Sequence, residues 1–303
     1  MNLHNNNELF NSLIKATSDY YGIDISLIEK DYYVTMVLMK LNDKIPGLMF
    51  KGGTCLSKCF KVIDRFSEDI DLTLDNEHFS QSQKRHANKL IIEVSDETGL
   101  ELKNRERVES HSHSSYNAYF IDYPKLFPSN SIKTEIKVEM VFIQKAYPYM
   151  YKKANSYIGE YLEEIERNDL LDEYGLKSFL IKVQTLERTF VDKVFAICDY
   201  YLRKDALKNS RHLYDIYKII PNIELDKELG ELIKSVREDR KKVKRCVSSL
   251  DGIQIPKLLD EIIETEFYKD DYMINTKVLL IKKVDYEEVI KTLKTIISSK
   301  LFN

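Results

Sequence analysis

Two aspartates separated by a single residue, Asp69 and Asp71, have the spacing most suggestive of joint chemistry in this chain. Side chains two apart on an extended strand project from the same face, so these two carboxylates would lie together while Ile70 and Leu72 face the core. Carboxylates held this close repel each other unless a cation lies between them, and magnesium bound to substrate phosphates is the usual cation in such a site. The pair therefore predicts a metal dyad for phosphoryl or nucleotidyl transfer.

A Gly-Gly pair precedes these aspartates. Gly52 and Gly53 follow the apolar run Leu48-Met49-Phe50 and open a stretch with helical periodicity. Glycines after a strand remove the Cβ atoms that keep a ligand off the backbone, and the amides at the start of a helix attract anions. Alone, a Gly-Gly pair or an Asp-x-Asp pair is more typical of a turn or a solvated loop. The order strand, turn, helix, strand favours a phosphate cradle beside a metal dyad.

These two motifs together resemble the first motif of a known family. Lys51-Gly52-Gly53-Thr54, followed by Arg65-Phe66-Ser67-Glu68-Asp69-Ile70-Asp71-Leu72, is similar to that of the AbiEii/AbiGii toxin family of nucleotidyltransferases, which share the polymerase-β-type minimal fold. The resemblance implies transfer of a nucleoside monophosphate from an NTP, with release of pyrophosphate. It also implies nucleotide contacts from Lys51, Gly52, Gly53, Thr54 and Ser67.

A third carboxylate is expected on a neighbouring strand. The stretch 132–143 alternates cleanly, with apolar residues on one face and Glu135, Lys137 and Glu139 on the other. The family shows a Lys-x-Asp/Glu pattern at this place, which Lys137 and Glu139 match, so Glu139 is favoured over Glu135 as the third metal ligand. The alternative is an edge strand protected by alternating charges.

Two further candidates lie in the second half of the chain. The resemblance extends to Asp192-Lys193-x-x-Ala196, in which Lys193 would contact the triphosphate, and to residues 211–220, in which Asp215 would orient Lys193 or bind the attacking hydroxyl. Without the family, Lys193 is an ordinary surface lysine and Asp215 an ordinary helix carboxylate.

The elements that must position these residues follow from periodicity. Apolar spacing predicts two helices within 8–41, broken at Gly22 and with Asp24 or Ser26 as a cap, and a helix over 79–98 closed by Gly99. Strands are predicted near 100–108, 115–123, 132–143 and 179–183, and the chain is mostly helical from residue 155. Glu29-Lys30-Asp31-Tyr32-Tyr33 resembles an N-terminal signature of the same family, although most of these residues also fit a charged helix face.

The predicted fold class is therefore α+β. A polymerase-β-type nucleotidyltransferase core, a mixed sheet with flanking helices, would occupy residues 1–150 together with the N-terminal helices. A mainly helical C-terminal domain, residues 151–303, would close the active-site cleft.

Bulk properties exclude little. The 303 residues are 43% hydrophobic and 31% charged with a formal net charge of −3, so no global basic field recruits nucleic acid. The cysteines, Cys55, Cys59, Cys198 and Cys246, form no C-x-x-C pair, and we expect reduced thiols. The N-terminus resembles no signal peptide and no window is apolar enough to span a membrane, so we expect a cytoplasmic protein with no membrane partner.

Two local features allow alternatives. Six of the nine residues in 237–245 are basic, which fits either RNA contacts or a solvated helix. His111 and His113 lie in a Ser-rich loop with no third ligand nearby in the sequence, which favours a solvent loop over a metal site.

The expected mechanism uses two Mg²⁺ ions, with Mn²⁺ as an alternative, held by Asp69, Asp71 and Glu139. One ion would lower the pKa of the acceptor hydroxyl and the other would stabilise the leaving pyrophosphate. The resemblance implies a toxin with an RNA acceptor such as tRNA and a separately encoded antitoxin. An aminoglycoside-type nucleotidyltransferase and a non-catalytic module that binds nucleotide or a partner remain alternatives. The sequence specifies neither the NTP nor the oligomeric state.

Overall fold

The computed structural model describes residues 2–74, 80–110, 116–127, 129, 132, 135–142 and 147–303. The chain folds into two compact units, each built from several stretches of sequence. The first comprises Met1–Cys59, Glu68–Ile143 and Met150–Val183, and the second comprises Phe60–Ser67, Gln144–Tyr149 and Gln184–Asn303. No helix among the described residues has the length and apolar character needed to cross a membrane.

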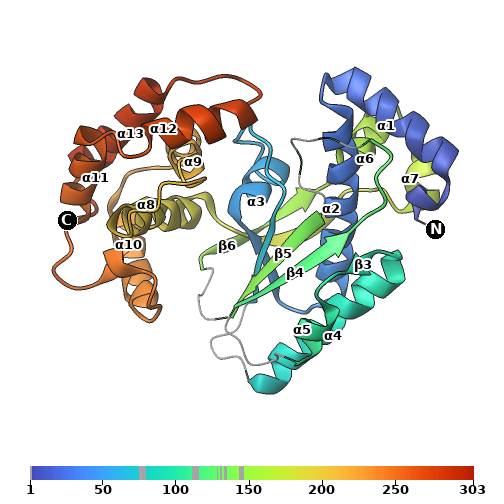
Figure 1. The fold of residues 1–303 in the computed structure, drawn as a ribbon, viewed down its shortest axis with the longest axis horizontal. Coiled ribbons are helices and arrows are strands. Elements are labelled where there is room, and N and C mark those ends of the chain that lie inside the picture. Colours follow the sequence, from blue (N-terminus) through green and yellow to red (C-terminus); the bar gives the residue numbers. More distant parts are fainter. Residues whose placement is uncertain are drawn as a thin grey trace. The chain divides into compact units, whose positions relative to one another are not determined.

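A mixed sheet forms the centre of the first unit (Figure 1). In the described part of the chain it has seven strands in the order β3-β4-β5-β2-β1-β7-β6. Their bounds are β1 Leu48–Lys51, β2 Ile70–Leu74, β3 Glu101–Leu102, β4 Tyr116–Asp122, β5 Glu135–Val141, β6 Tyr149–Ala154 and β7 Phe179–Gln184. The central strand β2 runs antiparallel to β1 and parallel to β5.

The alternation predicted for the strands is present. Ile70 and Leu72 of β2 and Val138 and Met140 of β5 are fully buried, while Asp71 between the first two is only partly buried. Apolar side chains from neighbouring strands thus form one continuous face of the sheet, and the polar side chains lie on the other face. Together with the helices, this sheet confirms the predicted α+β class, a mixed sheet with flanking helices.

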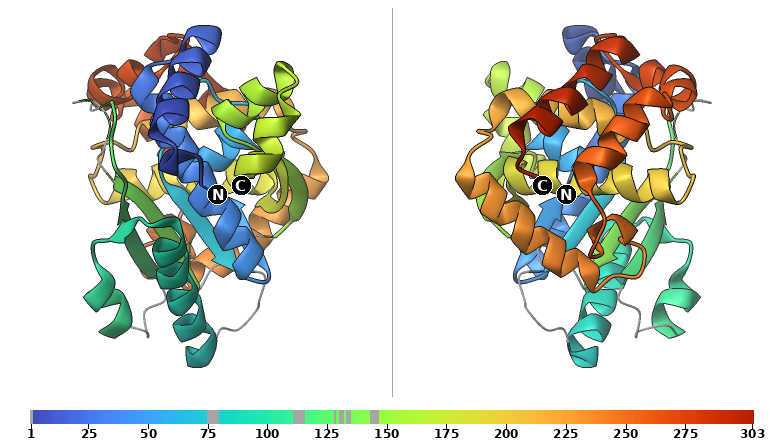
Figure 2. Two further views of the ribbon diagram at one scale, coloured as in Figure 1. Left: turned by 90° about the vertical axis from the view of Figure 1, so that its right-hand side faces the viewer. Right: turned by 90° about the vertical axis from the view of Figure 1, so that its left-hand side faces the viewer.

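Helices surround this sheet in the first unit. They are α1 Asn7–Tyr21, α2 Ile25–Lys44, α3 Gly52–Lys58, α4 Gln81–Thr98, α5 Arg105–Ser110, α6 Tyr157–Glu164 and α7 Asn168–Tyr174, with a short 3₁₀ turn at Leu3–Asn5. Helix α2 packs against α1, α4, α6 and β5, and the left view of Figure 2 shows α1 and α2, in shades of blue, next to each other. It is therefore an internal helix.

The helix ends follow the predicted signals. Gly22 ends α1 with φ +64°, and the Asp24 side chain caps α2 by accepting a hydrogen bond from the Ser26 amide at 2.9 Å. Helix α4 begins with a capping box between Ser80 and Gln83, and Gly99 closes it with φ +69°. Of the two caps expected for α2, the structure selects Asp24.

One predicted strand is wrong in its second half. The strand expected over 100–108 ends at Leu102, and Arg105–Ser110 form the helix α5 instead. Beyond Leu102 this stretch is charged and consists largely of good helix formers, with Val108 as its one buried side chain in α5. One buried apolar side chain is enough to pack a short helix against α4, whereas a half-buried strand would need apolar residues at every second position.

The second unit is helical. Its helices are α8 Leu186–Leu202, α9 Arg211–Ile219, α10 Lys227–Lys241, α11 Ile255–Glu264, α12 Lys269–Asp271 and α13 Tyr286–Ser299, with 3₁₀ turns at Ile220–Asn222, Val247–Ser249 and Lys277–Leu279 and a π-helical turn at Tyr272–Thr276. Helix α8 lies at the centre and packs against α9, α10 and α11. Phe190, Val194 and Phe195 of α8 are fully buried in this bundle.

Candidate active site

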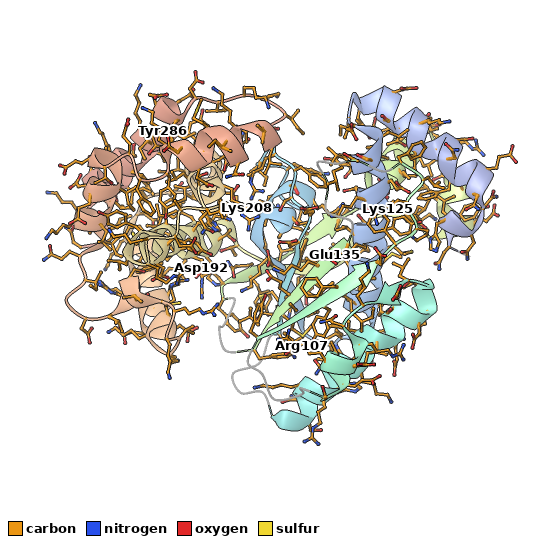
Figure 3. All side chains as sticks on the ribbon, in the orientation of Figure 1. Arg107, Lys125, Glu135, Asp192, Lys208 and Tyr286 are labelled. Atoms are coloured by element: carbon orange, nitrogen blue, oxygen red, sulfur yellow. The ribbon has the colours of Figure 1, made fainter. Side chains whose placement is uncertain are left out.

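Three strands bring charged side chains into one row on the polar face of the sheet. Asp71 of β2 lies opposite Lys51 of β1 on one side and opposite Glu139 of β5 on the other. Because residues directly opposite each other in a sheet project to the same face, the two carboxylates are lateral neighbours. Glu135, labelled on β5 in Figure 3, lies opposite Asp122 of β4 instead. The register thus sets Glu139, and not Glu135, beside Asp71.

Glu139 is held by two further side chains. Lys137, two residues earlier on the same face of β5, forms an ion pair with its carboxylate. The hydroxyl of Tyr116 on β4 donates a hydrogen bond to the same carboxylate. Tyr116 is not among the residues that the sequence singled out. It lies two positions from Ala118, which opposes Glu139, so an assignment of strand register would have placed it on this face.

Burial and the closeness of the Asp71 and Glu139 carboxylates shift the pKa values of both groups. Burial, followed by the adjacent Glu139 and the nearby Asp69, raises the pKa of Asp71 to about 7, against the opposing effect of Lys51. Burial also acts to raise the pKa of Glu139, but hydrogen bonds from Lys137, Tyr116 and Asp71 outweigh it and lower that pKa. Without a cation, Asp71 thus tends to retain a proton near neutral pH and to donate it to Glu139.

The glycine turn is built against these carboxylates. Gly52 has φ +78°, and a Cβ atom added there would meet Asp71 Oδ2 at 1.9 Å. Thr54 is fully buried, and its hydroxyl donates a hydrogen bond to the backbone carbonyl of Asp69 at 2.6 Å. Gly52 therefore provides space for a carboxylate, and Thr54 fixes the backbone ahead of β2. Their predicted contacts with nucleotide remain predictions.

These residues fit a divalent cation. Within the described parts of the chain, no group of three or more His, Cys, Asp or Glu side chains forms a ready-made metal site. Mg²⁺, however, is usually held by one or two carboxylates together with substrate phosphates and water. Asp71 and Glu139 supply two carboxylates, and Asp69 lies close enough to raise the pKa of Asp71. A cation would replace the proton that this pair shares.

A second group of charges lies inside the helical unit. The Asp215 carboxylate on α9 accepts a hydrogen bond from Lys193 Nζ on α8 at 2.6 Å, and Arg65 donates to both of its oxygens at 2.7 Å each. All three side chains are buried. The structure thus brings Lys193 and Asp215 into contact, while their predicted roles toward a nucleotide remain predictions. Arg65 is a partner that the sequence did not indicate.

In the cluster of Asp215, Lys193 and Arg65, the attraction between opposite charges counteracts the effect of burial on the pKa values of Asp215 and Lys193. Burial alone would raise the pKa of Asp215, but Arg65 and Lys193 outweigh it and hold that pKa well below its usual value. Burial lowers the pKa of Lys193, and Asp215 acts in the opposite direction. Burial, followed by Lys193, lowers the pKa of the neighbouring His212 well below its usual value, so His212 is neutral at pH 7.

The segment before β2 is attached to this helical unit. Arg65 forms an isolated antiparallel bridge with Leu280, and the amide of Asp64 donates a hydrogen bond to the Tyr214 hydroxyl at 3.1 Å. Ser67, a predicted phosphate contact, belongs to this segment of the second unit. His111 and His113 lie outside the described residues.

The basic stretch 237–245 is largely engaged within its own unit. Arg240 is buried and pairs with Asp192 and Asp199 of α8, the former labelled in Figure 3. Arg237 donates to the carbonyls of Ser249, Leu250 and Ile253, while Lys241 pairs with Glu238 and Asp251 and Lys242 pairs with Asp239. Most of these cations therefore stabilise the fold.

A mixed sheet with paired carboxylates on adjacent central strands, preceded by a Gly-Gly turn and joined to helices, defines the nucleotidyltransferase class of fold. The family described as "Nucleotidyl transferase AbiEii toxin, Type IV TA system" matches residues 38–294, and this chain belongs to it. A comparison with curated proteins finds no match.

Proposed function

We propose that this protein transfers a nucleoside monophosphate from an NTP to a hydroxyl group of an RNA such as tRNA, as a toxin that a separately encoded antitoxin opposes. The observation that carries the proposal is the register that sets Asp71 beside Glu139 on adjacent parallel strands. Family membership supports both the class of reaction and the toxin role. Pyrophosphate is the second product.

In this proposal Asp71, Glu139 and Asp69 hold two Mg²⁺ ions, for which Mn²⁺ can substitute. Such ions neutralise phosphate charge and lower the pKa of a bound hydroxyl group. Lys137 and Tyr116 keep Glu139 ionised and oriented, because both donate hydrogen bonds to its carboxylate. Lys51 adds a positive charge opposite Asp71. The chain thus supplies position and charge, while the NTP supplies the reactive bond.

A small-molecule acceptor of the aminoglycoside kind is the second candidate. The observation that favours it is the internal pairing of Arg237, Arg240, Lys241 and Lys242, which leaves that stretch with few cations for a phosphate backbone. Both candidates use the same carboxylates, so the acceptor must be identified by experiment.

The test is incubation of the purified protein with Mg²⁺ and each α-labelled NTP in turn, with total RNA, an aminoglycoside or no acceptor. We expect label in RNA from one preferred NTP. Asp71→Asn and Glu139→Gln should abolish it, since each removes a carboxylate from the proposed cation site. Glu135→Gln is the matched control, because it alters a carboxylate on the same face of β5 that lies opposite Asp122.

Each outcome separates the alternatives. Label in the aminoglycoside alone would replace the RNA acceptor with a small molecule. Label that survives Asp71→Asn would refute the carboxylate pair as the centre of the reaction. No label with any NTP or acceptor, from protein that is folded by circular dichroism, would favour a non-catalytic module.

A further inference from the structure

Helix α2 has an unusual feature for an internal helix. The eleven residues from Ile28 to Leu38 are all buried, and three consecutive ones, Glu29, Lys30 and Asp31, carry carboxylate or ammonium groups. Burying a charge without a partner is costly, so each of these side chains needs a compensating group. Since consecutive residues of a helix point in different directions, the three charges reach three different parts of the unit.

Two of the three stabilise general features of the fold. The Glu29 carboxylate accepts hydrogen bonds from the backbone amides of Leu126 and Phe127, at 2.6 and 3.0 Å, and so holds the loop after β4. Asp31 forms a buried ion pair with Lys58 at the end of α3 and accepts a hydrogen bond from the Tyr157 amide at the start of α6, at 2.8 Å.

Lys30 differs because its partner adjoins the candidate active site. Its side chain is 0% exposed and forms an ion pair with Glu68, whose side chain is 20% exposed. Glu68 is the residue directly before Asp69 and lies three residues before Asp71. The backbone carbonyl of the next residue, Asp69, accepts a hydrogen bond from the Thr54 hydroxyl at 2.6 Å. Glu68 and Thr54 together therefore fix the entry to β2.

We propose that Lys30 is a positioning residue: by binding Glu68, it fixes the backbone that carries Asp69 and Asp71 and so determines the affinity of the site for a divalent cation. This inference rests on the proposed function. Groups that orient metal ligands without touching the metal commonly alter its affinity by about 10–100-fold.

The test measures Mn²⁺ binding to the full-length protein by electron paramagnetic resonance, with thermal unfolding of the same samples. Lys30→Met should weaken Mn²⁺ binding by about tenfold or more, in the range typical of such orienting groups. The double variant Lys30→Met/Glu68→Met retains no uncompensated charge from this pair, so it should recover most of the thermal stability. It should still bind Mn²⁺ weakly, because the connection between α2 and Glu68 is absent.

Lys58→Met is the matched control. It breaks a buried ion pair to the adjacent residue of α2, Asp31. The Lys58 ammonium also donates to the Asn155 carbonyl at 3.4 Å and lies over the Tyr157 ring, so it binds a different part of the unit from Glu68. We expect a comparable loss of stability with Mn²⁺ affinity near that of the wild type.

Three results would overturn the inference. They are wild-type affinity in Lys30→Met, recovery of affinity together with stability in the double variant, and an equal loss of affinity in Lys58→Met. Should the single Lys30→Met variant fail to fold, the double variant decides the question. If the wild-type protein does not bind Mn²⁺, both the proposed cation site and this inference are rejected. If the wild-type protein binds Mn²⁺ and Lys30→Met binds it equally well, only the inference is rejected.

Discussion

At Gly52 an added Cβ atom and the Asp71 carboxylate would occupy the same space. The positive φ of this residue admits glycine most readily, and the closeness of Asp71 excludes a Cβ atom even if the backbone tolerated one. From the sequence, Gly52 was predicted to let a ligand approach the backbone. The structure shows that this glycine is also needed to leave space for the Asp71 carboxylate. The two roles are compatible, since a turn without side chains leaves its amides accessible.

This geometry predicts the effect of Gly52→Ala. The new methyl group must displace the Asp71 carboxylate, so we expect loss of nucleotidyl transfer by at least about 100-fold, as for other small misplacements in catalytic sites. Strain at positive φ should lower the free energy of unfolding by about 1–2 kcal/mol. Gly22→Ala is the control, because Gly22 has φ +64° and nothing within 4 Å of an added Cβ. It should lose similar stability and retain activity; full activity of Gly52→Ala would contradict the packing against Asp71.

Some residues of the candidate site could be predicted from the sequence, and others could not. Period-two alternation specified the face of Asp71 and Glu139, and the resemblance to the family supplied the expectation that their strands are neighbours and the preference for Glu139 over Glu135. Tyr116 and Arg65 could not be found this way. Their partners are set by strand register and by tertiary packing, which the local sequence does not encode.

At the scale of elements, α8 and α9 are joined by a buried charge cluster. The Asp215 carboxylate forms ion pairs with both Lys193 and Arg65, and removing it would leave two buried cations next to each other. Breaking a buried ion pair from one side is far more damaging than removing an exposed pair. The cluster therefore contributes to the attachment of residues 60–67 to these helices.

We expect Asp215→Asn to destabilise the protein at pH 7 by about 3–5 kcal/mol, measured by urea unfolding. The folded pKa of Asp215 lies below its unfolded value of about 3.9, so its ionised form contributes stability above that pH and loses the contribution as the pH falls toward the folded pKa. The difference between wild type and variant should therefore narrow below about pH 4. Glu238→Gln, in an exposed pair with Lys241, should change stability by less than about 1 kcal/mol. An equally small effect of Asp215→Asn would show that the cluster is not needed for stability.

Helices and strands were predicted well where the apolar pattern repeats over a long stretch of sequence, and poorly where the stretch is short. The helix over 79–98 and the strand over 115–123 correspond to α4 and β4 within two residues. Residues 100–108 were not a single strand, because one buried valine among charges carries too little periodicity to separate a short helix from a strand.

At the scale of the whole molecule, the two compact units interleave along the chain. The sequence places a division at residue 150, and β7, which follows it, pairs with β1 through Phe50 and Val183 in the first unit. The stretch Phe60–Ser67 belongs to the second unit and leads directly into Glu68 and β2. The pairing of β7 with β1 and the contacts of Asp64 and Arg65 with α9 produce this discontinuity, and composition along the chain does not reveal it.

The last prediction concerns whether the helical unit takes part in the reaction. The resemblance assigns a triphosphate contact to Lys193, and this lysine is buried against Asp215. If the contact is made, Lys193→Ala should raise the KM for NTP and lower turnover, because a positive charge near the leaving pyrophosphate is lost while Asp71 and Glu139 are unchanged. Mn²⁺ affinity should stay at the wild-type value. Lys193→Arg should be at best partly active, since a planar guanidinium rarely replaces a point charge.

The measurement is a titration of NTP against each variant, after circular dichroism has shown that it is folded. Lys218→Ala is the control, because Lys218 is a cation on α9 whose partner is Asp64 at 2.8 Å rather than Asp215. It should keep the wild-type KM. Since Lys193→Ala leaves Asp215 paired with Arg65, its loss of stability should be smaller than that of Asp215→Asn, so impaired transfer by folded Lys193→Ala reports on the nucleotide. Wild-type KM and turnover in Lys193→Ala would instead assign the cluster to the scaffold and leave the reaction to the residues of the sheet.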